Sequence, residues 1–306
     1  MRRPFAHDLS RMDFWLPVVG LPVAFLVWGS LALFSIPLGL LAAGILAGAP
    51  ATGFTAWLPG VGALLILCIQ YFAFNLFHFD GLLDTADAFL GAGDKERKLA
   101  ILKDSRIGVY AFFVGFVYLA AKLAFLALVV SVALESAGLM YGRMSGSTST
   151  STLSGTVPIS GTIALRSQLG FLVAFFAYPL AGRLAAALIP CILPSARPGG
   201  LGSLALGSRP GRALMGAGIA LFVYLCIGLP LISSSGLPVR DSAWLTLAIC
   251  IILPLAALAA LAFVVRVYRK GVGGYTGDAL GAAVELGELV HMAIVCLSFF
   301  VVASLV

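Results

Sequence analysis

The 306-residue chain is 61% hydrophobic and only 10% charged, and its mean hydropathy is +1.07. Soluble proteins contain about 25% charged and about 45–50% apolar residues, so this composition excludes soluble, disordered, collagen-like and disulfide-scaffold classes. The net charge of +6 does not indicate nucleic-acid binding, because the basic residues lie in short loops between apolar segments, where they orient a membrane protein. We therefore expect no nucleic-acid partner and a single integral membrane domain, residues 1–306, in contact with the lipid bilayer.

Seven apolar segments are long enough to cross a membrane, since a span needs about 20 mostly apolar residues. We predict an all-α transmembrane helix bundle of about seven spans, and residues 37–49 could add a half-helix to it. The predicted spans are residues 14–34, 55–79, 107–134, 169–193, 213–235, 243–265 and 279–304.

The basic residues predict how these spans are oriented. Fourteen of the 19 lie before the first span, between the second and third, after the fourth and after the sixth, whereas three lie in the other loops. Because basic loops stay in the cytoplasm, we expect a cytoplasmic N-terminus and an outer C-terminus. The uncharged stretch 144–163, rich in Ser, Thr and Gly, would then be a flexible loop on the outer side.

Acidic residues gather after the second span, in the motif that covers residues 77–108. Asp80, Asp84 and Asp87 are spaced i, i+4 and i+7, so three carboxylates share one stripe of a helix. Like charges at this spacing repel each other, and a divalent cation removes the repulsion. Mg²⁺ often combines a few carboxylates with substrate phosphates, so we predict that these residues bind Mg²⁺ and take part in catalysis. A solvated acidic face at the membrane boundary is the alternative.

More charged residues follow this stripe along the chain. Asp94 comes after a glycine-rich break and belongs either to a solvated helix face or to a substrate site. Lys103 and Arg106 precede the third span, where they could bind phosphate or flank a helix start capped by Asp104 or Ser105. We take Asp104 as the candidate general base, because it lies beside these cations and outside the carboxylate triad.

Two later blocks place charge within or near the membrane. Arg183 lies inside the fourth span and Arg197 just after it, and Asp278 opens the last span, with Glu285 and Glu288 deeper on roughly the same face. Ionisable groups inside a membrane are usually functional. We predict one polar cavity between the acidic helix, span four and span seven, where the arginines contact phosphate and Glu285 orients an arginine or a second metal. A structural ion pair outside the site is the alternative.

The motif DGLLDTADAFLGAGDKERKLAILKDSRIG, which begins at Asp80, resembles the signature of the cobalamin-5'-phosphate synthase family, also called adenosylcobinamide-GDP ribazoletransferases. The resemblance continues with Lys122-Leu123, Gly182-Arg183, the Ala-Arg-Pro at 196–198, and GGYTGDALGAAVELGELV at 273–290. It implies an enzyme of the cell inner membrane. Because the motif blocks fall on the side with the fourteen basic residues, we expect the active site to face the cytoplasm. A CDP-alcohol or prenyl transferase would show other aspartate spacings, and a transporter would place its charges near the midplane.

The resemblance also implies a reaction. The hydroxyl of α-ribazole, or of its 5'-phosphate, would attack the phosphorus attached to cobinamide in adenosylcobinamide-GDP, and GMP would leave, with Mg²⁺ bound to the diphosphate. Whether the chain forms a homo-oligomer stays open. The residues expected to bind substrate are Asp94, Lys103, Arg106, Arg183, Arg197, Asp278, Glu285 and Glu288.

Overall fold

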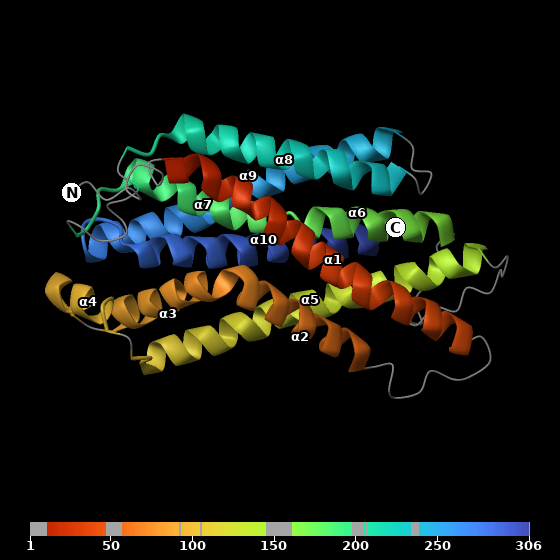
Figure 1. Ribbon diagram of the computed structural model, residues 1–306, viewed down its shortest axis with the longest axis horizontal. Helices are drawn as coiled ribbons and strands as arrows, with labels where there is room; N and C mark the ends of the chain where they lie inside the picture. The colour runs from red at the N-terminus through yellow and green to blue at the C-terminus, as the bar shows by residue number, and fades with distance from the viewer. Residues whose placement is uncertain are drawn as a thin grey trace, which may run out of the picture.

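The computed structural model describes residues 11–46, 57–91, 93–104, 106–144, 161–197, 205, 207–233 and 239–305, which are almost entirely helical. A helix bonds its own backbone N–H and C=O groups, as a segment in lipid requires. The helices lie side by side in an elongated bundle (Figure 1). They are α1 (Met12–Leu46), α2 (Leu58–Gln70), the π-helical turn η4 (Tyr71–Asn75), α3 (Leu76–Leu90), α4 (Lys95–Ile101), α5 (Val109–Met144), α6 (Gly161–Phe175), α7 (Tyr178–Ile192), α8 (Pro210–Ser233), α9 (Val239–Gly271) and α10 (Gly277–Leu305).

Seven helical stretches among the described residues are long and apolar enough to cross a membrane, which confirms the predicted all-α multi-pass bundle. The second span is longer than predicted, because α2, η4 and α3 join into Leu58–Leu90 and carry the acidic stripe on their last turns. Residues 37–46 continue α1 and do not form a separate half-helix. The predicted flexible loop falls largely on residues 145–160, which lie outside the described residues.

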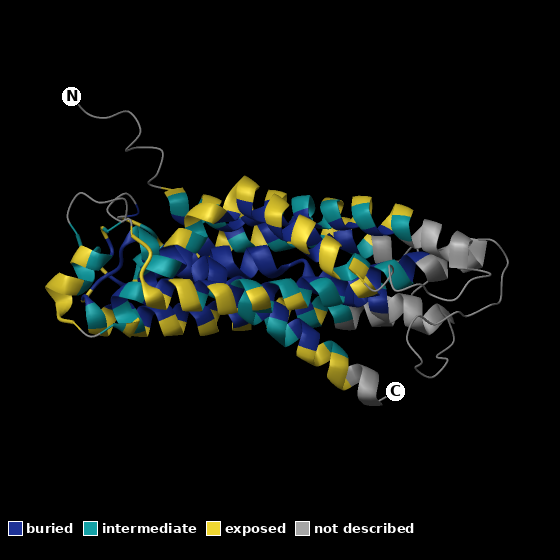
Figure 2. Ribbon diagram, turned by 90° about the horizontal axis from the view of Figure 1, so that it is seen from below, coloured by how far each residue is buried: buried dark blue, intermediate teal, exposed yellow. Residues whose placement is uncertain are grey.

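Helices α7 and α10 form the centre of the bundle. α7 is buried along nearly its whole length and packs against α1, α8, α9 and α10, whereas α10 also packs against α3. Buried residues run through the middle of the bundle and exposed ones cover its outside (Figure 2). Many exposed side chains are large and apolar, as at Phe72, Phe112 and Phe222. An apolar surface of this extent is expected where lipid replaces water.

The links after α3, after α7 and before α10 meet at one end of the bundle, which we call the acidic end (Figure 1). Backbone hydrogen bonds join two of these links: the Ala196 N–H donates to the Tyr275 carbonyl (2.8 Å), and the Tyr275 N–H donates to the Pro194 carbonyl (2.9 Å). Gly273 adopts a φ of +78°, a conformation that favours glycine. This pairing ties the end of the fourth span to the start of the last span.

Candidate active site

Four carboxylates meet at the acidic end. Asp80, Asp84 and Asp87 follow one stripe of α3, and the first turn of α10 brings Asp278 beside them. The two helices approach closely because Gly81 has no side chain: a methyl group there would lie 2.9 Å from the Asp278 carbonyl oxygen. The charges of the other three carboxylates all act on Asp84. We call these four residues the acidic cluster.

The acidic cluster carries more negative charge than its surroundings balance. Among the described residues, neither Asp80 nor Asp84 forms an ion pair with a lysine or arginine. The described residues also contain no group of three His, Cys, Asp or Glu side chains that could hold a metal ion by themselves. Mg²⁺ commonly takes one or two carboxylates and fills its shell with water and substrate phosphates. The donor set therefore fits a Mg²⁺ ion that is shared with a phosphorylated substrate.

Asp87 also caps a helix. Its carboxylate accepts hydrogen bonds from the N–H of Gly108 (2.6 Å) and of Ala111 (2.8 Å). Because α5 begins at Val109, these are N–H groups that find no partner inside the helix. The interpretation that Asp104 caps this helix is wrong, because α5 starts too far along the chain for it to do so.

Asp104 and Arg106 form an exposed ion pair in the link between α4 and α5. The Arg106 Nε lies 2.9 Å from Asp104 Oδ1. The hydrogen bonds from Arg106 hold the pKa of Asp104 below its usual value and raise the pKa of Arg106. A carboxylate with a low pKa is a weak base. Lys103 is exposed nearby, and Asp94 caps α4 by accepting the Arg97 N–H (2.9 Å).

Arg197 connects α4 to the acidic cluster. Its Nη2 donates to the Leu99 carbonyl of α4, and its positive charge acts on Asp278. The Arg197 Nε is buried and has no hydrogen-bond partner among the described residues. Of the predicted phosphate-binding residues, Arg197 is therefore the one that the structure places beside the cluster with a donor still available.

Arg183, Glu285 and Glu288 lie deeper, in a layer of polar side chains that we call the buried network. Glu285 is seven residues from Asp278, about 10 Å along α10 at 1.5 Å per residue. The three side chains are at most 1% exposed. The predicted single cavity is therefore two regions, one above the other on α10. The buried network consists of Gln70, Tyr71, Asn75, Tyr118, Lys122, Tyr178, Arg183, Glu285 and Glu288.

Two cations hold Glu288 from opposite helices. The Lys122 Nζ of α5 lies 2.7 Å from Glu288 Oε2, and the Arg183 Nη1 of α7 lies 2.8 Å from Glu288 Oε1. Asn75 accepts from Arg183 Nη2 (3.2 Å) and donates to both glutamates, at 2.8 Å to Glu285 and 3.1 Å to Glu288. Two acidic and two basic groups give this layer no net formal charge, which limits the cost of burying it.

The sequence analysis did not identify several members of the buried network. Gln70, Tyr71 and Asn75 lie in the apolar segment that forms α2 and η4, and Tyr118 and Tyr178 lie in other spans. A signal was present, because an amide inside a membrane span needs hydrogen-bond partners. The tyrosines gave no such signal, since their rings are common in apolar segments. Only the packing of four helices shows that these side chains converge.

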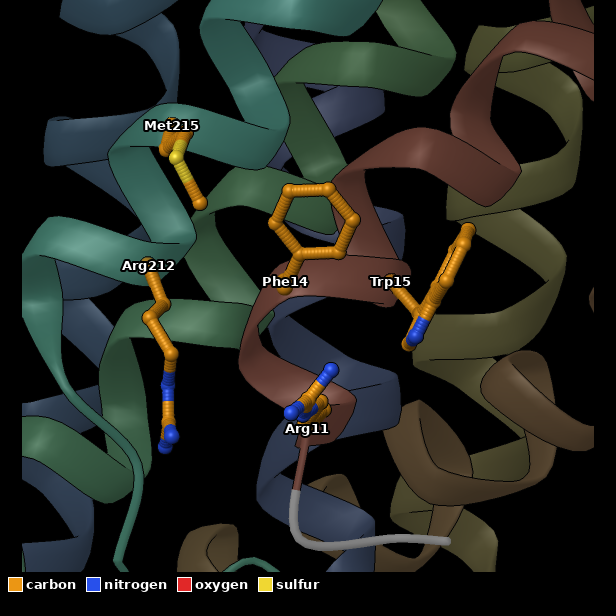
Figure 3. A pocket seen from close by; sticks show the side chains of 5 residues that line it. All are labelled: Arg11, Phe14, Trp15, Arg212 and Met215. Atoms are coloured by element: carbon orange, nitrogen blue, oxygen red, sulfur yellow. The ribbon is translucent and has the colours of Figure 1, made fainter.

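A separate hollow of about 240 Å³ lies between the starts of α1 and α8 (Figure 3). Arg11 and Arg212 line it together with three apolar side chains, of which Trp15 and Met215 are more than half exposed. Arg212 is bonded to the buried Asp13, with Nε 2.9 Å from its carboxylate. No member of the acidic cluster lines this hollow, so it is a different place from the candidate active site.

A family model described as cobalamin-5-phosphate synthase matches residues 2–158 and 156–296. The chain belongs to this family. It is 30% identical to the adenosylcobinamide-GDP ribazoletransferase of Pseudomonas putida (strain GB-1) and 31% identical to that of Pseudomonas entomophila (strain L48), with 94% of this chain and 87% of each relative covered. The Brucella anthropi enzyme of the same name is 32% identical over 71% of this chain and 65% of its own length. No solved structure matches.

Membership in the cobalamin-5-phosphate synthase family confirms the resemblance seen in the sequence and makes the chain an enzyme, a transferase. The match spans both of the segments that build the acidic cluster, α3 and the start of α10. In this chain, the motif blocks around Asp80, Arg197 and Asp278 are far apart in sequence and meet at the acidic end.

Proposed function

We propose that this chain is a Mg²⁺-dependent adenosylcobinamide-GDP ribazoletransferase, the activity for which its Pseudomonas and Brucella relatives are named. The hydroxyl of α-ribazole, or of its 5'-phosphate, attacks the phosphorus bonded to cobinamide. One phosphorus–oxygen bond forms, the bond to the GMP oxygen breaks, and the hydroxyl proton passes to a base. The observation that carries this proposal is the acidic cluster, in which carboxylates of two helices meet with little compensating charge.

Asp80, Asp84 and Asp87, the predicted metal ligands, and Asp278 beside them are the residues that would supply the one or two carboxylates that hold Mg²⁺ against the diphosphate. The bound ion would neutralise charge that develops on the phosphoryl and leaving oxygens. Asp87 keeps lone pairs beyond those that accept the two backbone N–H groups. In this account Asp87 also fixes the start of α5 beside the metal ligands.

The cations around the cluster would bind substrate phosphate. Arg197 offers its unpartnered Nε–H next to Asp278, and Lys103 and Arg106 lie in the link before α5. A phosphate that binds Arg106 would release Asp104 from its ion pair. The pKa of Asp104 would then rise toward its ordinary value, which makes Asp104 a better acceptor for the hydroxyl proton. Asp94 stands at the start of α4 as a further substrate-binding candidate.

The predicted orientation supports the same reaction, because it places the acidic end in the cytoplasm, where nucleotide substrates are found. The test is purified protein in liposomes with adenosylcobinamide-GDP and Mg²⁺, with and without α-ribazole or α-ribazole 5'-phosphate. We expect GMP and the joined corrinoid to appear in equal amounts and only when a ribazole is added. Release of GMP at the same rate without ribazole would refute transfer.

A further inference from the structure

Ion pairs between Lys122, Arg183 and the two glutamates lie at the centre of the buried network. A buried ion pair is weak support for stability, since apolar side chains of similar size often do as well. Here side chains from α2, η4, α5 and α7 converge on just two carboxylates of α10, Glu285 and Glu288. All four carboxylate oxygens accept hydrogen bonds. Such an arrangement specifies the position of one helix relative to the others.

The bonds to Glu285 and Glu288 hold α10 on several sides. Glu285 Oε2 accepts hydrogen bonds from Tyr71 (2.7 Å) and Tyr118 (2.6 Å). Glu288 forms ion pairs with Lys122 of α5 and Arg183 of α7. Sliding α10 along its axis by about 1 Å would stretch several of these bonds beyond the 2.7–3.2 Å range of good N–H···O contacts.

The same helix carries Asp278, about 10 Å away at the acidic end. There the helices touch at the backbone, since a methyl group at Gly281 would lie 2.6 Å from the His78 carbonyl oxygen. No side chain lies between α3 and α10 at this point to absorb a shift. Any displacement of α10 in the network therefore moves Asp278 relative to Asp80 and Asp84.

The π-helical turn η4 couples the network to the acidic stripe on the other side. Tyr71 and Asn75, which bond Glu285, begin and end this turn, and Asp80 is five residues beyond it. A π-turn contains one residue more than an α-helical turn, so it changes the rotation of the helix beyond it, and such turns are frequent at functional sites. η4 thus sets how the aspartates of α3 are rotated relative to the network.

We propose that Glu285 and Glu288 are positioning residues: the buried network fixes the height and rotation of α10 and thereby holds Asp278 against Asp80 and Asp84. This role rests on the proposed function in one respect, that these aspartates bind the metal. It gives Arg183, Glu285 and Glu288 a task other than contact with substrate.

The first test measures Mn²⁺ binding by electron paramagnetic resonance in the purified full-length chain. We compare wild type with Glu285→Gln and with the double variant Lys122→Met/Glu288→Gln, which removes one charge of each sign. We expect at least a 10-fold weaker Mn²⁺ affinity and at least a 10-fold lower kcat, with a KM for α-ribazole within about 2-fold, as expected for a lost transition-state interaction. The matched control is Asp13→Asn, which breaks another buried carboxylate site, the one bonded to Arg212 and to the Arg209 N–H. It should lower thermal stability and leave Mn²⁺ affinity unchanged.

A second test does not depend on metal. Spin labels at Leu90, at the end of α3, and at Val301, near the far end of α10, both exposed, report the position of α10 along α3. We expect a shifted or broadened distance distribution in both network variants and the wild-type distribution in Asp13→Asn. Unchanged distances together with wild-type kcat would overturn the positioning role. If wild type binds no Mn²⁺ while the distances shift, the metal assignment fails and the positioning role stands.

Discussion

Neutralising Asp84, the central carboxylate of the acidic stripe, should stabilise the metal-free protein. In Asp84→Asn, repulsion from four other carboxylates disappears, those of Asp80, Asp278, Asp87 and Asp104. Neighbours at i and i+4 lie about 6 Å apart, and Coulomb's law gives about 0.7 kcal/mol per pair in water and about 3 kcal/mol at an effective dielectric constant of 20. Because Asp84 is only half-buried, solvent screening favours the lower value. Asp80 and Asp87, the two neighbours on the same helix, then contribute about 0.7 kcal/mol each. We therefore expect a gain of about 1.4 kcal/mol, or roughly 3 °C in Tm for a chain of this size.

Adding Mg²⁺ should make the wild-type protein more stable than Asp84→Asn. A ligand at 100 times its Kd stabilises the folded state by about 2.7 kcal/mol, and wild type should gain this while Asp84→Asn gains little. The assay is thermal unfolding in detergent, in chelator and then in a Mg²⁺ series. Glu96→Gln is the matched control, an exposed carboxylate on α4 outside the acidic cluster, and it should behave as wild type. A less stable Asp84→Asn in chelator would show that Asp84 is not repelled by its neighbours, and a wild-type response to Mg²⁺ would show that it does not bind the metal.

Three further predictions concern the pH profile, the helix cap and the glycine contact. Arg106→Ala should return the lowered pKa of Asp104 toward its ordinary value. Because the carboxylate is the active form of the base, the acidic limb of the kcat/KM profile should then move to higher pH. An acidic limb at the wild-type pH would exclude Asp104 as the base. Asp87→Ala should lower the unfolding free energy by about 0.5–2 kcal/mol through loss of the α5 cap, measured in chelator so that metal plays no part; no loss there would argue against the cap. Gly182→Ala should lower the free energy of unfolding by more than about 1 kcal/mol, because its methyl group would overlap the Val284 carbonyl. Gly218→Ala is the control, because it has open space around it and should leave the stability unchanged or raise it. Equal effects of the two variants in thermal unfolding would contradict this helix contact.

The sequence predicted the fold well because lipid imposes simple rules. Apolar length and the need to bond every backbone group gave seven helical spans. The predicted end of the second span was wrong, because Asp80 and Asp84 looked too polar to continue an apolar span. In the structure they lie on the last turns of the same long helix. Helical periodicity could place the aspartates on one stripe, but it says nothing of what that stripe faces.

The division of the site into two regions could not be predicted from the sequence. The sequence places Arg183 inside the fourth span and Arg197 just after it, and both were expected to contact phosphate in one cavity. In the structure Arg183 is enclosed with Glu288 (2.8 Å), while Arg197 lies by the cluster with a donor to spare. Their difference depends on which residues of α5, α10 and η4 face α7, and that is decided by packing between segments more than 100 residues apart. The amides Gln70 and Asn75 were the available clue to it.

We propose that the acidic cluster performs metal-dependent ribazole transfer, and turnover in liposomes with controlled Mg²⁺ measures this activity. Purified protein with adenosylcobinamide-GDP and α-ribazole should form product with Mg²⁺, stop in excess chelator and resume when Mg²⁺ is restored. Asp84→Asn should form none under any of these conditions, while Glu96→Gln should match wild type. Product formation by Asp84→Asn at the wild-type rate, or wild-type turnover that persists in chelator, would contradict the account.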